Sequence, residues 1–222
     1  MELCLDTSTV ATISLVEDGE VLSQVTDPNP RRHAEGLGVL LTQCFHKAGI
    51  EGPIARVGID RIVVGTGPGP YTALRAGLAF AAALGRGLGV PAWGVGSLDA
   101  WGRQALDEVP GPVLILTDAK RKEVYYAVYD ADGADGVSAL VGPQVGPIEE
   151  ALAQGEGAPV FFVGLRPPHL TDTLEKTGAR SLVPYSASLT RVASARAATE
   201  PAPSFSRDPL YLRRPDIHHK GS

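Results

Sequence analysis

An apolar run that ends in an aspartate and leads into a hairpin pattern occurs twice in this chain. Residues 2–5 form the first run, which ends in Asp6, and residues 113–117 form the second, which ends in Asp118. Each is followed by an alternating segment and a turn that contains Asp-Gly. A strand, a polar loop and a hairpin that recur in one order predict a duplicated α/β architecture.

Helical and extended patterns alternate after each hairpin, which favours a parallel or mixed sheet covered by helices. We therefore expect two lobes, with a boundary at the Pro-Gly-Pro of residues 110–112. The predicted units are an N-terminal lobe at 1–109, a C-terminal lobe at 110–208 and a partly disordered tail at 209–222. The helices expected in these units span residues 33–47, 73–88, 97–106, 148–154, 170–176 and 188–198.

Composition indicates an ordinary globular protein. Of the 222 residues, 44% are hydrophobic and 20% are charged, and the net charge is −5. A negative chain has no general attraction for phosphate backbones, so we expect any RNA contact to be shared with a partner. The two cysteines lack disulfide or metal spacing, and the start carries no basic, apolar leader. These features predict a cytoplasmic protein without a membrane segment.

A glycine-rich loop at residues 65–72 joins a predicted strand to a predicted helix. Gly67 and Gly69 can expose backbone amides beside a helix N-terminus, an arrangement that suits an anion. The loop lacks the lysine of a Walker motif and the spacing of a dinucleotide fingerprint. Phosphate binding and a tight strand-to-helix turn capped by Thr72 both remain open.

Asp6 and Asp118 also have two interpretations. Both follow strands and could hold a metal-bound phosphate between the lobes, or each could bond the backbone of its own turn. The five histidines show no spacing typical of a metal site, and no serine or cysteine lies in a nucleophile motif. We therefore predict no metal, no cofactor and no catalytic residue.

The helix at 73–88 is rich in small residues, and one of its faces is bounded by arginines. That face holds Arg75, Leu78, Ala79, Ala82 and Arg86, which suits a protein interface as well as a core. The preceding helix, with Leu37, Leu41 and Cys44 at helical spacing, has the pattern of a core-facing helix.

Four segments, in this order and spacing, resemble the TsaB family. They are LDTST at residues 5–9, GTGPGPYTALRAG at 65–77, DAKRKEVY at 118–125 and PLYLR at 209–213. The family loop usually has serine where Pro70 stands and glycine where Ala73 stands. The resemblance implies the two-lobed fold of actin, sugar kinases and Hsp70 chaperones.

It further implies a non-catalytic subunit in threonylcarbamoyl modification of the adenosine beside the tRNA anticodon. The implied partners are a catalytic TsaD-like subunit, a TsaE-like ATPase and, within the complex alone, tRNA. A homodimer is expected in isolation. The catalytic relative carries a metal-binding histidine pair, whereas here His33 has no second histidine nearby.

In the TsaB family, the helices at the positions of the first two helices here bind the partner. The resemblance therefore favours an interface role for the small-residue face of the helix at 73–88. The implied partner-binding residues are His33, Leu37, Leu40, Leu41, Cys44, Arg75, Leu78, Ala79, Ala82 and Arg86. The implied degenerate nucleotide cleft contains Asp6, Thr7, Gly67, Gly69 and Asp118. The alternative is a Mg-ATP-dependent phosphotransferase or ATPase of the same fold.

Overall fold

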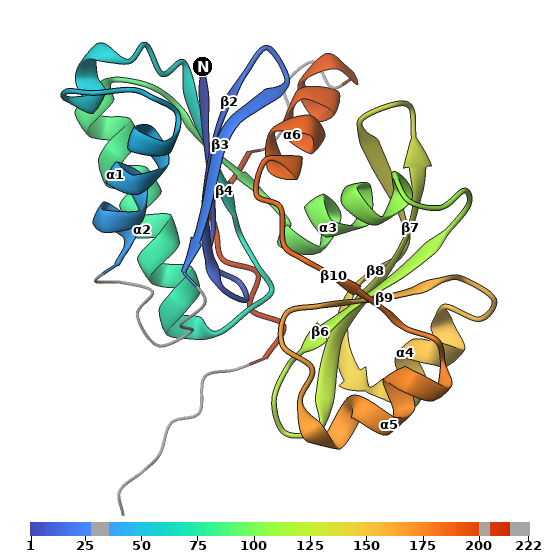
Figure 1. The fold of residues 1–222 in the computed structure, drawn as a ribbon. Helices are drawn as coiled ribbons and strands as arrows, with labels where there is room; N and C mark the ends of the chain where they lie inside the picture. The colour runs from blue at the N-terminus through green and yellow to red at the C-terminus, as the bar shows by residue number, and fades with distance from the viewer. Residues whose placement is uncertain (28–35, 200–204, 214–222) are drawn as a thin grey trace, which may run out of the picture.

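The chain forms two lobes, each built on a five-stranded mixed sheet (Figure 1). The computed structural model describes residues 1–27, 36–199 and 205–213. Within these residues, no helix combines the length and the apolar character that a bilayer-crossing segment requires.

The first sheet has the strand order β3-β2-β1-β4-β5, with β1 antiparallel to β2 and parallel to β4. In chain order, the first half of the protein contains β1 (Glu2–Asp6), β2 (Ala11–Glu17), β3 (Glu20–Asp27), α1 (Leu37–Lys47), the 3-10 helix η1 (Ile54–Arg56), β4 (Arg61–Gly65), α2 (Tyr71–Leu88), β5 (Ala92–Val95) and α3 (Ser97–Leu106).

The second sheet, β10-β9-β6-β7-β8, repeats this topology strand for strand, with β6 antiparallel to β7 and parallel to β9. The prediction of a duplicated, actin-like α/β fold is therefore confirmed. The second half of the protein contains β6 (Val113–Asp118), β7 (Glu123–Asp132), β8 (Gly136–Pro147), α4 (Ile148–Gln154), β9 (Val160–Val163), α5 (Pro168–Lys176), β10 (Arg180–Leu182) and α6 (Ser188–Thr199).

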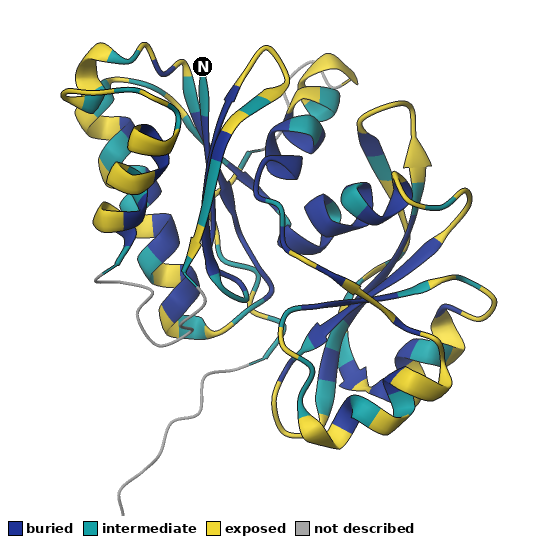
Figure 2. Cartoon of the chain, viewed as in Figure 1, coloured by how far each residue is buried: buried dark blue, intermediate teal, exposed yellow. Residues whose placement is uncertain are grey.

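The central strands of each sheet are buried on both faces, as their dark colour in Figure 2 shows. Successive side chains of a strand point to opposite faces of the sheet, so each sheet has one hydrophobic cluster on either face. In β1, Leu3 and Leu5 face α1 and α2, whereas Cys4 lies in the cluster with α6. In β6, Ile115 lies in the cluster with α3, whereas Leu116 packs with α4 and α5.

The last helix of each half packs across the boundary between the halves. The side chains of α3 fill the core of the second sheet, whereas α6 covers the first sheet. The predicted boundary at 109/110 therefore separates the two sheets but not the helices that cover them. This exchange places α3 and α6 against each other between the lobes (Figure 1).

The chain then returns to the first lobe as a segment at residues 205–213, here called the C-terminal strap. The Gly94 amide donates to the Phe205 carbonyl at 3.1 Å, and the Leu210 amide donates to the Thr66 carbonyl at 2.8 Å. Arg213 reaches the second lobe, where it pairs with Glu123. The strap therefore contacts both lobes, although its first residues fall in the predicted C-terminal lobe. The predicted disorder concerns residues from 218, outside the described range.

Two local features differ from the predictions. The helix α2 begins at Tyr71 after Pro70, and no side chain caps it, so Thr72 is not the predicted cap. The hairpin predicted after Asp118 is present as β7 and β8, whereas no strand was predicted at the position of β10. β8 is an edge strand whose register shifts between Val128 and Tyr126 of β7, where Gly142-Pro143 interrupts the apolar pattern.

Candidate functional site

Asp6 ends β1 inside the protein, with 3% of its surface exposed. Its Oδ1 accepts a hydrogen bond from the Ser8 amide at 2.7 Å, which closes a local turn. Its Oδ2 is buried and has no hydrogen-bond partner among the described residues. Burial raises the pKa of this carboxyl, although hydrogen bonds from Ser8 and Ser97 oppose the shift. Asp6 therefore serves its own turn here and is not part of the lining of the cavity between the lobes described below.

The next residues attach this turn to α2 and α3. The Thr7 hydroxyl donates to the Ala73 carbonyl at 2.8 Å, and the Ser8 and Ser97 hydroxyls lie 2.7 Å apart. Gly77 of α2 packs so closely on Thr7 that a Cβ at that position would overlap its side chain. Helix α2 therefore lies directly on the loop after β1, and Thr7 is buried beneath it.

The glycine loop is occupied by the protein's own groups. The Gly67 amide donates to Ser97 Oγ at 3.2 Å, and the Gly67 carbonyl accepts from the Ser97 amide at 2.8 Å. A Cβ on Gly69 would lie 2.7 Å from the Ser8 carbonyl oxygen. The peptide bond before Pro68 is cis. This geometry corresponds to the tight-turn interpretation, since the Gly67 amide already has a protein acceptor.

A cavity of about 480 Å³ lies between the lobes, next to this closed loop. The first lobe contributes Ser8, Thr9, Val10 and Pro70, and the second contributes Thr117, Asp118, Lys120, Val163, Gly164 and Leu165. Asp118 accepts a hydrogen bond from the Lys120 amide at 2.8 Å and pairs with Lys120 Nζ at 2.5 Å. Both loops that follow β6 and β9 therefore face the cleft.

Of the five predicted cleft residues, Asp118 alone is among those that line this cavity. Asp6 and Thr7 are buried, and Gly67 packs on Leu74. Sequence reasoning missed Thr9 and the segment Gly164-Leu165. The strand-end position of Gly164, which matches that of Gly65 in the first half, is the signal that could have identified it.

Metal-ligating side chains do not gather in this cleft. Within residues 1–27, 36–199 and 205–213, no group of three or more histidine, cysteine, aspartate or glutamate side chains could hold a metal ion. The two cysteines are free and buried, and burial raises the pKa of both thiols.

The predicted partner-binding residues divide between the core and the surface. Leu37, Leu40, Cys44 and Leu78 are buried in the first-lobe core, and Leu41 packs partly against it. They hold α1 and α2 on the sheet because their side chains follow the apolar face of each helix. For these residues the structure favours the core role, and His33 lies outside the described residues.

The outward faces of α1 and α2 remain open to solvent (Figure 2). Arg75, Ala79 and Arg86 are exposed, and Ala82 is half-buried. On α1, the apolar side chain of Val39 is 59% exposed. Arg75 stacks on the Tyr71 ring, with its guanidinium 4.4 Å from the ring centroid.

Sequence comparisons place the chain among known proteins. Residues 20–205 match the family described as TsaD, tRNA N6-adenosine threonylcarbamoyltransferase. An uncharacterized protein of Mycobacterium tuberculosis is 39% identical over 217 residues, which cover 96% of this chain and 92% of that protein. The tRNA threonylcarbamoyladenosine biosynthesis protein TsaB of Escherichia coli is 29% identical over 136 residues, which cover 59% of this chain and 55% of that protein.

Solved structures from Pseudomonas aeruginosa share the fold. One, described as an uncharacterized protein with similarity to peptidase YEAZ, has a TM-score of 0.74 at 24% identity and covers 96% of this chain and 99% of that chain. YeaZ has a TM-score of 0.64 at 23% identity and covers 89% and 93%. The family match, the duplicated topology and these neighbours agree: the chain belongs to the TsaD family and is a TsaB-like protein.

Proposed function

We propose that this chain is a non-catalytic subunit of the machinery that attaches threonylcarbamoyl to the adenosine beside the tRNA anticodon. It acts by binding a catalytic TsaD-like subunit. A TsaE-like ATPase joins the same cytoplasmic complex, and tRNA binds only there. In isolation the chain forms a homodimer.

The occupied glycine loop is the observation that carries the non-catalytic assignment. A phosphate-binding loop offers free backbone amides, whereas the Gly67 amide donates to Ser97 Oγ at 3.2 Å. Asp6 is buried beside Gly65 and Ser97 and is not among the residues that line the inter-lobe cavity.

The exposed faces of α1 and α2 support the partner-binding role. The two helices cover the same side of the first sheet (Figure 1), and their apolar residues hold them there while small and basic residues face outward. Small side chains such as Ala79 allow another helix to approach closely, as at protein interfaces with high packing density.

A Mg-ATP-dependent phosphotransferase or ATPase remains the second candidate, because Asp118 lines a cavity of about 480 Å³ between the lobes. The two functions differ in turnover. The proposed subunit has no nucleotide turnover alone, whereas tight Mg-ATP binding and a turnover that Asp6→Asn abolishes would favour the phosphotransferase.

Light scattering tests the proposed assembly directly. The chain is measured alone and with the TsaD-family catalytic protein of the same genome, and the samples are then assayed for tRNA modification. We expect a stable heteromer that is required for modification. Absence of association, together with intrinsic nucleotide turnover, would reject the proposal.

Two variants locate the contact on α2. Ala79→Arg and Ala82→Arg place a long charged side chain on the proposed interface and should weaken association about 100-fold or more. Ala198→Arg, at an exposed position of α6, is the matched control and should bind normally. Normal assembly of folded Ala79→Arg would exclude this face of α2.

A further inference from the structure

The loop between β6 and β7 differs in charge from its counterpart in the first half. In each half, four residues separate the strand that ends in aspartate from the next strand. The first loop, at residues 7–10, has no charged residue, whereas the second, at residues 119–122, contains Lys120, Arg121 and Lys122. All three are exposed. The second lobe therefore carries three positive charges at a position that is uncharged in the first lobe.

The same three residues have a left-handed backbone. Their φ angles are 63°, 53° and 65° in chain order. For a residue with a Cβ this conformation costs roughly 1–2 kcal/mol, and glycine or asparagine adopts it more easily. A turn selected for folding alone would therefore favour other residues here. Strained backbone conformations cluster at functional sites, and in this turn the strained residues are also the charged ones.

The positive charge of residues 120–122, here called the basic turn, exceeds the acidic charge at its ends. Asp118 pairs with Lys120 Nζ at 2.5 Å, and Glu123 pairs with Arg213 of the strap. Four cationic side chains thus accompany two carboxylates, in a chain whose net charge is −5. The Lys120 side chain is 78% exposed and lines the cavity between the lobes. The basic turn is therefore a local positive patch at the edge of the cleft.

The C-terminal strap brings an aromatic ring to the same edge. The Arg213 guanidinium donates to the Ala119 carbonyl at 3.1 Å, directly before the basic turn. Tyr211 lies two residues earlier, is 37% exposed and stacks on Tyr71, with ring centroids 4.9 Å apart. Tyr71 follows Pro70, which lines the cavity from the first lobe. An exposed tyrosine and the basic turn therefore lie near each other where the two lobes meet.

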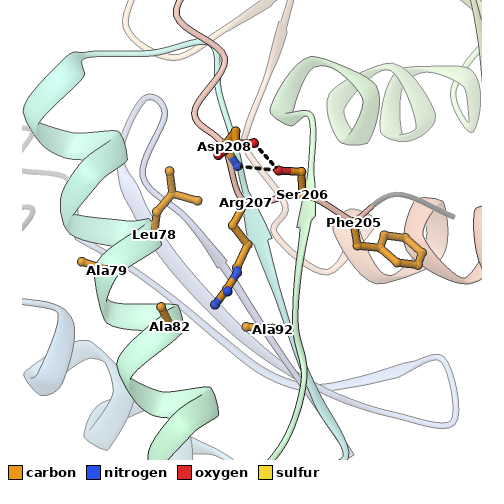
Figure 3. A pocket seen from close by; sticks show the side chains of 8 residues that line it. All are labelled: Leu78, Ala79, Ala82, Ala92, Phe205, Ser206, Arg207 and Asp208. Carbon is orange, nitrogen blue, oxygen red and sulfur yellow. Dashed lines mark hydrogen bonds between the residues drawn. The ribbon is translucent and has the colours of Figure 1, made fainter.

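Hydrogen bonds anchor the strap before it reaches Tyr211. The Ser206 hydroxyl donates to the Asp208 carboxylate at 2.6 Å, and the Asp208 amide donates to Ser206 Oγ at 3.1 Å (Figure 3). The Leu210 amide donates to the Thr66 carbonyl at 2.8 Å. A ligand that stacks on Tyr211 therefore meets a ring whose backbone is already in place, which lowers the entropic cost of binding.

These features suit RNA better than an acidic protein segment. Lysine and arginine bind the phosphates of nucleic acids, and exposed aromatic rings stack on unpaired bases. Charged residues are instead depleted from the cores of protein interfaces.

We propose that the basic turn and Tyr211 bind an unpaired stretch of RNA, with Arg121 and Lys122 on phosphates and Tyr211 on a base. For the identity of the RNA, the inference rests on the proposed function, in which tRNA binds the assembled complex. It adds the surface of this chain that the tRNA contacts and the role of each residue there.

Fluorescence anisotropy of a labelled, unmodified tRNA transcript tests this surface. The transcript is titrated with the heteromer of this chain and the TsaD-family catalytic protein at several salt concentrations. The double variant Arg121→Gln/Lys122→Gln leaves the pair between Lys120 and Asp118 in place. At about 0.1 M salt it should weaken RNA binding about ten-fold, and the slope of log affinity against log salt should fall by about two, because two phosphate contacts are lost.

A matched double variant controls for the loss of charge. Arg56→Gln/Lys176→Gln removes the same two residue types from exposed positions. Arg56 precedes β4 and Lys176 precedes β10, whereas the cavity lies at the carboxyl ends of the parallel strands β6 and β9. This control should bind the transcript as the wild type does.

Two substitutions of Tyr211 test the stacking. Tyr211→Phe keeps the ring and should bind the transcript normally, whereas Tyr211→Ala should weaken binding about ten-fold. Thermal unfolding of each variant verifies the fold, and equal binding by the phenylalanine and alanine variants would contradict a stacking role.

The outcomes separate this inference from the proposed function. If the Arg121→Gln/Lys122→Gln heteromer binds the transcript as tightly as the wild type, the RNA surface is wrong and the proposed function stands. If the catalytic protein never binds this chain, the proposed function is wrong. The chain alone is then titrated at about 0.02 M salt, where phosphate contacts are strongest. Binding that the double variant weakens and the control retains would support the RNA surface, and no binding would overturn it.

Two further results would assign the basic turn to another ligand. ATP that displaces the transcript at micromolar concentration would indicate a site for nucleotide phosphates. Light scattering that shows a lost heteromer in the Arg121→Gln/Lys122→Gln variant, with RNA binding by the chain alone unchanged, would indicate a protein contact. Either result would contradict the inference.

Discussion

Asp6 and Asp118 occupy the same position in the two halves and make the same backbone bond. Each carboxylate accepts from the amide two residues ahead, at 2.7 Å for Ser8 and 2.8 Å for Lys120. They differ in their surroundings, since Asp6 is 3% exposed and Asp118 lines the inter-lobe cavity. The shared bond indicates that the aspartate stabilises the turn in both halves. Whether its carboxylate is also accessible from the cavity depends on how closely neighbouring loops cover it.

The glycines beside the two aspartates explain this difference. Gly65 follows Val64, the partner of Leu5 in β1, and Gly164 follows Val163, the partner of Thr117 in β6. A Cβ on Gly65 would lie 2.5 Å from Asp6 Oδ2, whereas a Cβ on Gly164 would find its nearest atom, in Thr9, at 3.4 Å. In the first half, close packing buries the aspartate at the end of β1. In the second half, the aspartate at the end of β6 remains accessible from the cavity.

The largest expected effect comes from Gly65→Ala. Its methyl group would overlap Asp6 and Ser97, which are both buried, so the free energy of unfolding should fall by about 3 kcal/mol. Gly164→Ala has room for the methyl but a φ of +93°, and should cost about 1 kcal/mol. Urea denaturation of both variants measures the difference, and equal losses would contradict the proposed asymmetry.

The outer edges of the two sheets differ as well, and Phe205→Ala tests that difference. The strap covers the β5 edge, where Phe205 stacks on Trp93 with ring centroids 4.1 Å apart and an interplanar angle of 3°. Losing this stack should lower the free energy of unfolding by about 2 kcal/mol.

Hydrogen exchange localises the effect of Phe205→Ala. Amide exchange should accelerate in β5, because the Gly94 amide bonds the Phe205 carbonyl, while the equivalent strand β10 is unchanged. Equal acceleration in both strands would indicate global destabilisation and contradict a local role for the strap.

A smaller, pH-dependent effect is expected for Asp6→Asn. Burial raises the pKa of Asp6 above 3.8, so the folded state holds the proton more tightly than the unfolded state does. Stability from this group is complete below the unfolded pKa and is lost as pH rises through the folded pKa. The stability of Asp6→Asn relative to wild type should therefore increase as the pH rises from 3 to 7.

Calorimetry across that pH range measures this gain, and Asp118→Asn is the matched control in the second half. If the wild-type protein loses no stability relative to Asp6→Asn as pH rises, the environment of Asp6 does not favour its protonated form, and the prediction is wrong.

Local sequence patterns predicted the fold well because they depend on short-range physics. The predicted helices at 97–106 and 148–154 match the structure at both ends. Strand β10 escaped prediction because its three residues, Arg180–Leu182, are too few to show an alternating pattern.

The cleft was harder to predict, because its state depends on contacts between distant segments. Nothing local to Gly67 shows that Ser97 will accept its amide, or that α3 will join the opposite lobe. The same limit applies to the proposed partner-binding face of α2. Periodicity identified the α2 stripe, but only the folded strap brings Arg207 beside Ala82.

The smallest expected effect comes from Lys120→Gln, which removes the partner of Asp118. Lys120 is 78% exposed on its side chain, and an exposed pair of this kind contributes little because water and salt screen it. The free energy of unfolding should change by no more than about 0.5 kcal/mol, and added salt should remove the difference. The Asp118 turn keeps its backbone bond from the residue-120 amide, so the loop should remain in place. A loss comparable to that of Gly65→Ala would mean that the second aspartate is as closely integrated as the first, and the contrast between a closed half and an open half would then fail.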